Sequence, residues 1–418
     1  MHLSRRRFLT LSAGLAVGGL AACRPDDPGI SVGAPRPATV PTTRPSTTVA
    51  AVTTPDVTDE RVLVVVQLNG GNDGLNTLVP LDGRYRDARP RLAVPEADLV
   101  ALGGRPGYAL HPALAPLATW WESGWVAALP AIGFADPNRS HFVSMDRWWR
   151  ADDLANPAGW LGRWLDGLPA DLPTLGATAF GSGAPLLVGS RRVPTVVASP
   201  SGFRFPRSLD PRLIAALASP PSSDPLVARA QASLAIAVEA VDDLADLADG
   251  DEQVDTAREG RATLTEGLSL AAELVNADLG TRVVVVSAGG FDTHANEAAV
   301  HDDLLADLAA GLAGFLDAVG AGGRADRVLV ATTSEFGRRV AENGSGGTDH
   351  GAAGLSFLLG PSVVGGVHGP ADLGHLLDGD VRPEVDPRTL YTACLDWLGG
   401  DADAILGRRY DEVTLVRA

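Results

Sequence analysis

Five short runs of apolar, largely β-branched residues recur along the chain and predict buried strands. They lie at 61–68, 125–129, 281–286, 327–332 and 355–359. The first contains Val-Leu-Val-Val-Val without an interposed polar residue. Such a run is typical of a strand that is covered on both faces. We therefore expect a central sheet with other elements packed against each side.

Amphipathic stretches with helical spacing lie between these runs. They cover 112–122, 141–150, 224–249, 254–277, 298–319 and 387–398. Strands that alternate with such helices predict an α/β fold with a doubly wound, mostly parallel sheet and helices on both faces. We expect one domain of this kind over 61–418, with an Ala- and Leu-rich helical insertion at about 210–280.

The first 60 residues have a different pattern. Arg5-Arg6 precede a short apolar run that ends in Ala21-Ala22-Cys23, an order that resembles a twin-arginine signal followed by a lipobox. The run is too short and too rich in Gly and Ala for a spanning helix. We expect 1–23 to be a twin-arginine lipoprotein signal and the Pro- and Thr-rich stretch 24–60 to be a linker.

This signal predicts a protein that is exported and held at the membrane by a lipid on Cys23, facing the periplasm or the cell exterior. An unprocessed apolar anchor is the alternative. The other cysteine, Cys394, lies in an apolar pattern and predicts a buried thiol. A cysteine nucleophile is therefore not expected.

The net charge of the chain limits the kinds of molecule that it is expected to bind. The 418 residues include 51 acidic and 34 basic side chains, for a net charge of −17. An acidic surface of this size disfavours nucleic acid as a partner. It still allows an anionic substrate, because a bound metal reverses the sign of the local field.

Polar residues with metal-binding chemistry stand at the ends of the predicted strands. They are Asp73, Asp292, His294, Glu335, Asp349 and His350. In open α/β sheets the ligand crevice lies beyond the carboxyl ends of the strands. Carboxylates and imidazoles suit a divalent cation, so the pattern predicts a site for zinc, manganese, iron or calcium. Singly, each residue could instead be part of an ordinary turn or cap.

Arg139-Ser140-His141 stands where the helix predicted over 141–150 begins. A serine there is typical of a helix N-cap, but a helix N-terminus also stabilises an oxyanion, so Ser140 is a candidate nucleophile. His141 is a candidate base, with a structural role left open. Arg139 or Arg338 could clamp the oxygens of an ester.

Taken together, these segments resemble the domain-of-unknown-function family 1501. The matching stretches are 70–80, 140–142, 290–294, 333–338 and 347–351. The family is similar to the alkaline phosphatase and sulfatase superfamily, in which metals and a nucleophile sit at the strand ends. The resemblance implies that Ser140 is the nucleophile. It implies metal ligands at Asp73 or Asn69, Asp292, His294, Glu335 and His350. Phe336 stands where the superfamily usually has a histidine, so the alternatives to a full two-metal site are one metal or a degenerate non-catalytic site.

From these features we expect an exported, metal-dependent hydrolase of a small phosphate or sulfate ester. The alternative is a non-catalytic cell-envelope lipoprotein that binds a polysaccharide or a partner protein. Six tryptophans of the first half could then form an aromatic platform, although packing in the core explains most of them. They are Trp120, Trp121, Trp148, Trp149, Trp160 and Trp164.

Overall fold

The structure is a computed structural model. It describes residues 60–197 except 105, 170, 171 and 182, scattered residues between 213 and 238, and residues 263–417. The predicted signal at 1–23, nearly all of the linker at 24–60, and most of the insertion at 210–280 lie outside the described residues. The same holds for the helix predicted at 224–249 and for the first part of the one at 254–277.

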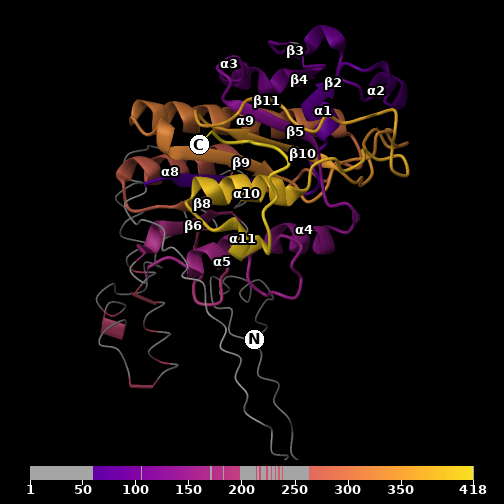
Figure 1. Cartoon of the computed structure of the whole chain (residues 1–418). Coiled ribbons are helices and arrows are strands. Elements are labelled where there is room, and N and C mark those ends of the chain that lie inside the picture. Colours follow the sequence, from indigo (N-terminus) through magenta and orange to yellow (C-terminus); the bar gives the residue numbers. More distant parts are fainter. Residues whose placement is uncertain are drawn as a thin grey trace, which may run out of the picture. The chain divides into compact units, whose positions relative to one another are not determined.

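The centre of the body is an eight-stranded sheet with the order β11-β5-β10-β9-β1-β8-β6-β7 (Figure 1). Its strands are β1 Val62–Leu68, β5 Val126–Ile132, β6 Ala177–Phe180, β7 Thr195–Val197, β8 Val283–Ala288, β9 Val328–Thr333, β10 Gly354–Leu359 and β11 Gly366–Val367. Neighbours pair in parallel except at β10, which is antiparallel to both β9 and β5. The five predicted strands and the mostly parallel α/β architecture are confirmed.

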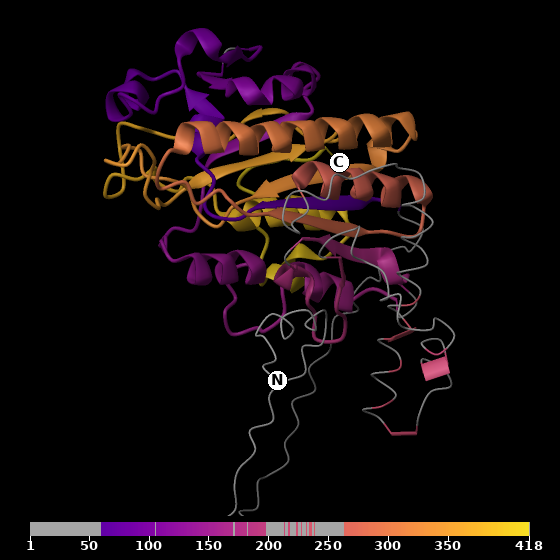
Figure 2. The ribbon, with the colours of Figure 1, turned by 180° about the vertical axis from the view of Figure 1, so that it is seen from behind.

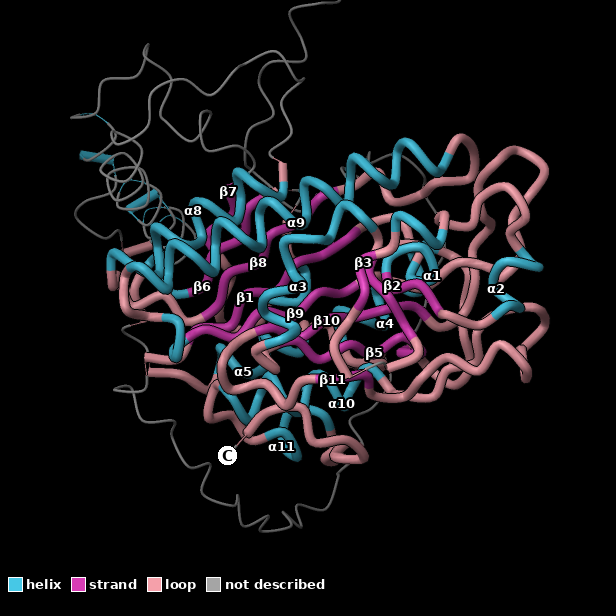
Figure 3. The backbone as a smooth tube through the Cα atoms, turned by 90° about the horizontal axis from the view of Figure 1, so that it is seen from above, coloured by secondary structure: helices cyan, strands magenta, loops and turns pink. Residues whose placement is uncertain are grey.

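Helices cover both faces of this sheet, as predicted. On one face lie α8 Leu264–Ala277 and α9 Glu297–Ala321; on the other lie α4 His141–Arg150, α5 Trp160–Asp166, α10 Pro387–Trp397 and α11 Ala402–Leu406. Figure 2 shows the layers from behind, with the long helix α9 lying over the sheet, and Figure 3 shows α8 and α9 over the strands from above.

The side chains of β1 explain why two layers of helices are needed. Val64 and Val66 belong to the core under α8 and α9, whereas Leu63 and Val65 belong to the core under α5 and α10. Successive side chains of a strand point to opposite faces, so an uninterrupted apolar strand requires a cover on each side. This is why the sequence of β1 lacks polar alternation.

A smaller part of the body lies between β1 and β5 in the sequence. It contains a three-stranded antiparallel sheet of β2 Leu78–Pro80, β4 Tyr108–Leu110 and β3 Val100–Ala101. Its helical segments are α1 Gly74–Thr77, α2 Gly83–Ala88, η2 Glu96–Asp98, η3 Pro112–Leu117 and α3 Ala118–Glu122. The helix predicted over 112–122 is split into η3 and α3, because Pro116 cannot donate a helical hydrogen bond.

Three further short turns of 3₁₀ helix are η4 Thr174–Gly176, η5 Pro185–Leu187 and η7 Ala325–Arg327. Among the described helices, α9 alone is long and apolar enough to cross a membrane by length and composition. Its side chains Leu308, Leu312 and Phe315 are buried in the core over the sheet. A core helix passes the same test, so α9 is read as part of the body.

Candidate metal centre

Four histidine and aspartate side chains meet at the carboxyl edge of the central sheet. Asp292 and His294 follow β8, and His141 opens α4 after β5. His350 precedes β10, which runs against its neighbours, so the start of β10 lies at the same edge as the ends of the others. The topology thus gathers residues from three distant segments at the edge where α/β sheets bind their ligands.

Each of the three histidines lies beside Asp292, and His350 also lies beside both other histidines; we call these four residues the His/Asp cluster. Nε2 of His294 and Nε2 of His350 each lie 3.0 Å from Oδ1 of Asp292 and 2.9 Å from each other. Nε2 of His141 lies 3.5 Å from Oδ2 of Asp292. Candidate ligand atoms of His141, Asp292 and His350 all fall within 4.8 Å of each other, a spacing that a single ion can bridge.

Each histidine of the cluster is held through its other ring nitrogen. Nδ1 of His141 lies 2.8 Å from Oε1 of Glu335, and Nδ1 of His294 lies 3.3 Å from Oδ1 of Asp349. Nδ1 of His350 lies 2.8 Å from the carbonyl oxygen of Arg139. A carbonyl oxygen only accepts, and ionised carboxylates do the same, so each imidazole in its Nδ1–H tautomer can donate to its partner and present the Nε2 lone pair to a cation.

In that tautomer three Nε2 lone pairs face the Asp292 carboxylate. Nε2 of His294 and Nε2 of His350, 2.9 Å apart, then have no hydrogen between them and would repel each other. A cation removes that repulsion, because Nε2 lone pairs and a carboxylate oxygen are ligands that zinc and related metals accept. Metal-binding histidines characteristically donate Nδ1–H to a carboxylate or carbonyl. The donor set of the cluster therefore fits a divalent metal.

Asp292 is kept ionised by its neighbours. Partial burial works to raise the pKa of its carboxyl, but the Arg338 guanidinium and the neighbouring imidazoles of His350 and His294 outweigh burial and lower the pKa to about 2. Nη2 of Arg338 lies 2.8 Å from Oδ1 of Asp292. The cluster accordingly contains one carboxylate anion at any pH at which the fold operates.

Glu335 and Asp349, predicted as metal ligands, contact the histidines of the cluster on the Nδ1 side, away from the candidate ligand atoms. Glu335 is buried and accepts hydrogen bonds from His141 and from the backbone N–H of Gly70. Asp349 contacts His294 and Asn343, and the hydrogen bond from Asn343 is the main cause of its lowered pKa. Both orient imidazoles of the cluster in this structure.

Phe336 packs against two histidines of the cluster. Its ring centroid is 4.9 Å from that of His141 and 4.5 Å from that of His350. Gly71 makes room for this ring: it has φ +80°, and an added Cβ would lie 2.3 Å from Phe336 Cε2. The position at which the superfamily usually has a further histidine is therefore occupied by a phenylalanine ring that packs against the cluster. Because this ring offers no ligand atom, it favours a single metal.

The predicted guanidinium clamps are both occupied. Arg338 is buried and donates to the carbonyl oxygens of Gly70, Gly71, Phe291 and Thr348 as well as to Asp292. Its role here is to tie the loops after β1 and β8 together. Arg139 pairs with buried Asp380. The donors of buried Arg338 are therefore taken up by protein groups, whereas the side chain of Arg139 pairs with Asp380 through Nε and Nη2 and remains 45% exposed.

Asp73 lies apart from the cluster, against the prediction that it is a metal ligand. It is fully buried and forms an ion pair with fully buried Arg89. Burial opposes its ionisation, but the Arg89 guanidinium and a hydrogen bond from Glu297 hold the pKa of Asp73 well below its usual range. The charge that a metal would supply is here supplied by Arg89.

Glu297 and His301 of α9 complete this buried network, which no sequence pattern predicted. Burial and the adjacent Asp73 raise the pKa of Glu297 to about 9, so it keeps its proton and donates it to Asp73. It also accepts a 2.7 Å hydrogen bond from Thr348 Oγ1, two residues before His350. Burial lowers the pKa of His301 to about 4, so it is neutral. The network supports the loops behind the cluster.

Ser140 occupies the N-cap position of α4 next to His141. Its side chain is exposed and makes no capping hydrogen bond, although the backbone has the extended conformation of a cap. The hydroxyl is thus exposed, one residue before His141 of the cluster. His141, expected as a base, places Nε2 among the candidate ligand atoms; the only signal for that role was its position at a helix start after a strand.

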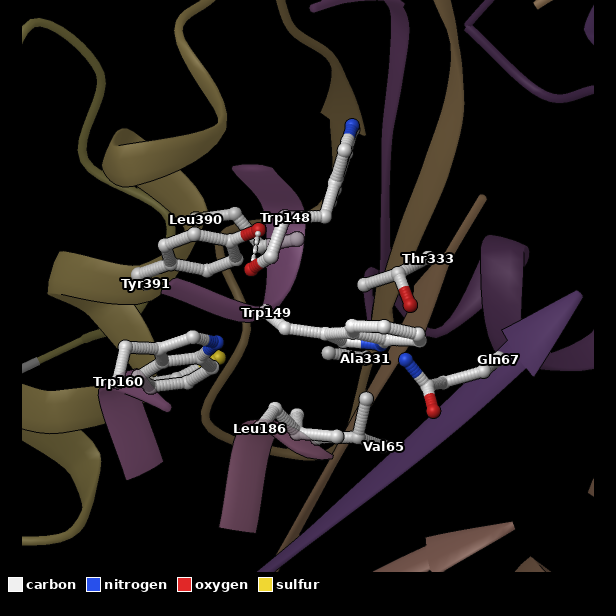
Figure 4. A pocket seen from close by; sticks show the side chains of 11 residues that line it. Val65, Gln67, Trp148, Trp149, Trp160, Leu186, Ala331, Thr333, Leu390 and Tyr391 are labelled. Atoms are coloured by element: carbon white, nitrogen blue, oxygen red, sulfur yellow. Dashed lines mark hydrogen bonds between the residues drawn. The ribbon is translucent and has the colours of Figure 1, made fainter. Parts of the chain in front are cut away.

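Beneath this edge a small apolar cavity separates the sheet from α4 and α10 (Figure 4). Its volume is about 10 Å³, room for no more than one water. Gln67 of β1, Thr333 of β9 and Trp149 of α4 lie together in its wall. Cys394 also lines it and is a free, buried cysteine, as predicted. The cavity is too small for a substrate and no residue of the His/Asp cluster lines it.

Solved structures that resemble the chain include proteins of the superfamily that the sequence resemblance names. A protein in the alkaline phosphatase superfamily from Vibrio parahaemolyticus has 8% identity and a TM-score of 0.39, covering 85% of this chain and 71% of that one. The C-terminal periplasmic domain of EcEptC from Escherichia coli, in complex with zinc, has 11% identity and a TM-score of 0.42, covering 85% and 88%.

The PsFucS1 sulfatase from Pseudoalteromonas sp. has 11% identity and a TM-score of 0.35, covering 84% of this chain and 70% of that one. At these identities and TM-scores the likeness carries no argument about activity. A search of curated proteins finds no match.

The family comparison is more direct. The model of the DUF1501 family, described as a protein of unknown function, matches residues 150–412. The match includes Asp292, His294 and His350 of the cluster, together with Glu335, and begins after His141. Because it spans more than half of the sequence, the chain belongs to the DUF1501 family.

Proposed function

We propose that the protein is an exported, metal-dependent hydrolase of a phosphate or sulfate ester. The observation that carries the proposal is the His/Asp cluster, in which three imidazoles have Nδ1 engaged and Nε2 directed at Asp292. A divalent metal held there would supply Lewis-acid charge to an ester oxygen and lower the pKa of a bound water or hydroxyl.

The chain's own groups have distinct tasks in this proposal. His141, His294, His350 and Asp292 bind the ion. Glu335, Asp349 and the Arg139 carbonyl fix the three rings, which keeps Nε2 deprotonated and aimed. Exposed Ser140 supplies the nucleophilic hydroxyl at the N-terminus of α4, where backbone N–H groups favour an anion.

The test is metal content. Protein purified without chelator is expected to carry close to one equivalent of divalent metal, and His350→Ala to lose most of it. Glu335→Gln, which acts through His141, should weaken the affinity about tenfold to a hundredfold. His375→Ala is the matched control, because His375 pairs only with Asp372 on the exposed surface.

Two results would end the hydrolase proposal. One is native protein that contains no metal and takes up none; the other is His375→Ala losing as much metal as His350→Ala. The alternative is then a non-catalytic envelope lipoprotein. A specific observation favours that alternative: the two arginines beside the cluster, Arg139 and Arg338, are already paired with protein groups.

A further inference from the structure

A tight turn near the metal centre holds a buried carboxylate between two arginines. Leu377 and Asp380 pair across the turn, and the backbone N–H of each donates to the carbonyl oxygen of the other at 2.9 Å. Asp378 and Gly379 at its centre both have positive φ, +53° and +86°, as two-residue turns of type I′ require. The side chain of Asp380 is only 1% exposed. The turn therefore fixes one carboxylate at a defined position.

Arg139 and Arg339 approach this carboxylate from two separate segments. Nε and Nη2 of Arg139 both donate to Oδ2 of Asp380, Nε at 3.0 Å. Nη2 of Arg339 donates to the carbonyl oxygen of Asp378, and its Nε lies 3.7 Å from Oδ1 of Asp380. Gly379 makes room for this guanidinium, because an added Cβ would lie 2.5 Å from Nη2 of Arg339. We call Arg139, Arg339 and Asp380 the two-arginine site.

The acceptors of the protein do not saturate the two-arginine site. The side chain of Arg139 is 45% exposed and that of Arg339 is 34% exposed. Among the described residues, neither Nη1 of Arg139 nor Nη1 of Arg339 has a hydrogen-bond partner. Unused N–H groups on guanidinium forks are suited to an oxyanion such as a carboxylate or a phosphate.

The charges of the site point to the same kind of ligand. Two guanidinium groups share one carboxylate, so the site has an excess of positive charge although the chain as a whole has a net charge of −17. The double hydrogen bond from Arg139 already pairs Asp380. Arg339, at 3.7 Å, is too far for a hydrogen bond to Asp380 and adds a like charge beside Arg139. An anion between the two guanidinium groups would remove that repulsion.

The backbone of both arginines connects this site to the His/Asp cluster. The carbonyl oxygen of Arg139 lies 2.8 Å from Nδ1 of His350, and the N–H of Arg339 donates to the carbonyl oxygen of Asp349 at 3.0 Å. Nε2 of His350 is directed to the other side, at Asp292. Arg139 thus borders His350 on the side opposite its candidate ligand atom. This placement suits a group that neighbours the metal-bound ester better than it suits the ester itself.

We propose that the two-arginine site binds an oxyanion of the substrate, a carboxylate or a phosphate, that is separate from the ester that reacts. The inference rests on the proposed function for the reacting ester, whereas binding of an anion at this site is independent of the metal. The substrate is accordingly an ester that carries a second anionic group. Asp380 is a positioning residue here, since it acts through the two guanidinium groups.

Calorimetric titration of the full chain with inorganic phosphate and with succinate tests the site. The titrations are made at low ionic strength, before and after treatment with chelator. At least one anion is expected to bind in both states, and the tighter one identifies the oxyanion. Arg339→Gln and Arg139→Gln should each weaken that binding about tenfold or more. Arg409→Gln is the matched control, because Arg409 is 40% exposed and makes two hydrogen bonds to Asp396. Melting temperatures show whether each variant is folded.

Turnover provides a second measurement on the metal-loaded protein. Phenyl phosphate and 4-carboxyphenyl phosphate, or the corresponding sulfates, differ by one carboxylate. Arg339→Gln should lower kcat/KM for the carboxylated ester about tenfold and leave kcat/KM for the plain ester nearly unchanged. A merely structural role of the two-arginine site would change both values by the same factor.

The results separate the two proposals. The anion site is overturned if neither anion binds at millimolar concentration, or if Arg409→Gln weakens binding as much as Arg339→Gln does. Equal losses of kcat/KM for the two esters in Arg339→Gln also overturn it. If the protein contains no metal and hydrolyses no ester, yet binds an anion in an Arg339-dependent manner, the hydrolase proposal fails and the anion site stands.

Discussion

At the scale of single residues, the centre depends on which nitrogen of each histidine is engaged. The Arg139 carbonyl, Glu335 and Asp349 are each placed to accept a hydrogen bond from an Nδ1–H group of one histidine. In that tautomer Nε2 of each ring is available to a metal. Two of these acceptors are carboxylates that the sequence suggested as ligands. Their type and position were visible in the sequence, but whether a carboxylate binds an ion or orients a ring depends on distances that only the fold sets.

Ser140 provides a residue-scale prediction. Ser140→Ala should abolish hydrolysis of an aryl phosphate or aryl sulfate by removing the hydroxyl beside the cluster. Because the side chain makes no capping hydrogen bond, the free energy of unfolding should change by no more than about 0.5 kcal/mol. Turnover and thermal unfolding measured on the same sample decide the matter.

Ser144 is the control for this experiment. Its buried hydroxyl donates to the carbonyl oxygen of Asn138, so Ser144→Ala should lower the melting temperature and leave turnover by the folded protein measurable. Unchanged turnover in Ser140→Ala would show that this serine is not the nucleophile.

At the scale of elements, long β-branched runs were sufficient to predict β1, β8 and β9. β6 was missed because its four residues, Ala177–Phe180, form no recognisable run and are stabilised by pairing with β7 and β8. The prediction of Asp73 as a metal ligand was wrong for a related reason. Its partner Arg89 is sixteen residues away, and nothing local shows that both side chains become fully buried together.

The start of α9 gives an element-scale prediction, because Glu297 keeps its proton only in the folded state. Its pKa rises from an ordinary 4.5 to about 9, through burial and the adjacent Asp73. Between those values the unfolded chain releases the proton and the folded chain keeps it. The folded state therefore binds more protons, and stability from this group falls as pH rises.

Glu297→Gln should remove this pH dependence. An amide can still donate to Asp73 and accept from Thr348, but it does not ionise. Asp73, Arg89 and His301 surround the group, and of these only His301 titrates near the range, with a pKa of about 4. From about pH 6 to pH 9 the melting temperature of the unaltered protein should fall relative to the variant. Parallel curves for the two proteins would show that Glu297 is ionised in the fold.

At the scale of the whole molecule, the predicted signal at 1–23 lies outside the described residues. Its prediction is anchoring. Cys23→Ser should move the exported protein from the membrane fraction to the soluble fraction, because acyl chains contribute about 0.8 kcal/mol per buried methylene. Replacing Arg5 and Arg6 by lysine should retain the protein in the cytoplasm.

Fractionation followed by immunodetection measures both effects, with Cys394→Ser as the matched control, since that thiol is buried. A Cys23→Ser protein that still sediments with membranes would refute the lipid anchor.

The direction of β1 bears on where the substrate comes from. The strand starts at Val62, directly after the stretch expected to be a linker, and ends at Leu68, beside the loop that borders the metal centre. Seven extended residues span roughly 20 Å, so the chain enters the body at the edge opposite the centre. The predicted lipid anchor would then hold the body by that edge and leave the His/Asp cluster facing away from the bilayer. Substrates located away from the anchoring membrane would then be accessible to the cluster. Lipid headgroups of the leaflet that holds the anchor would be accessible only if the body rotated relative to its linker.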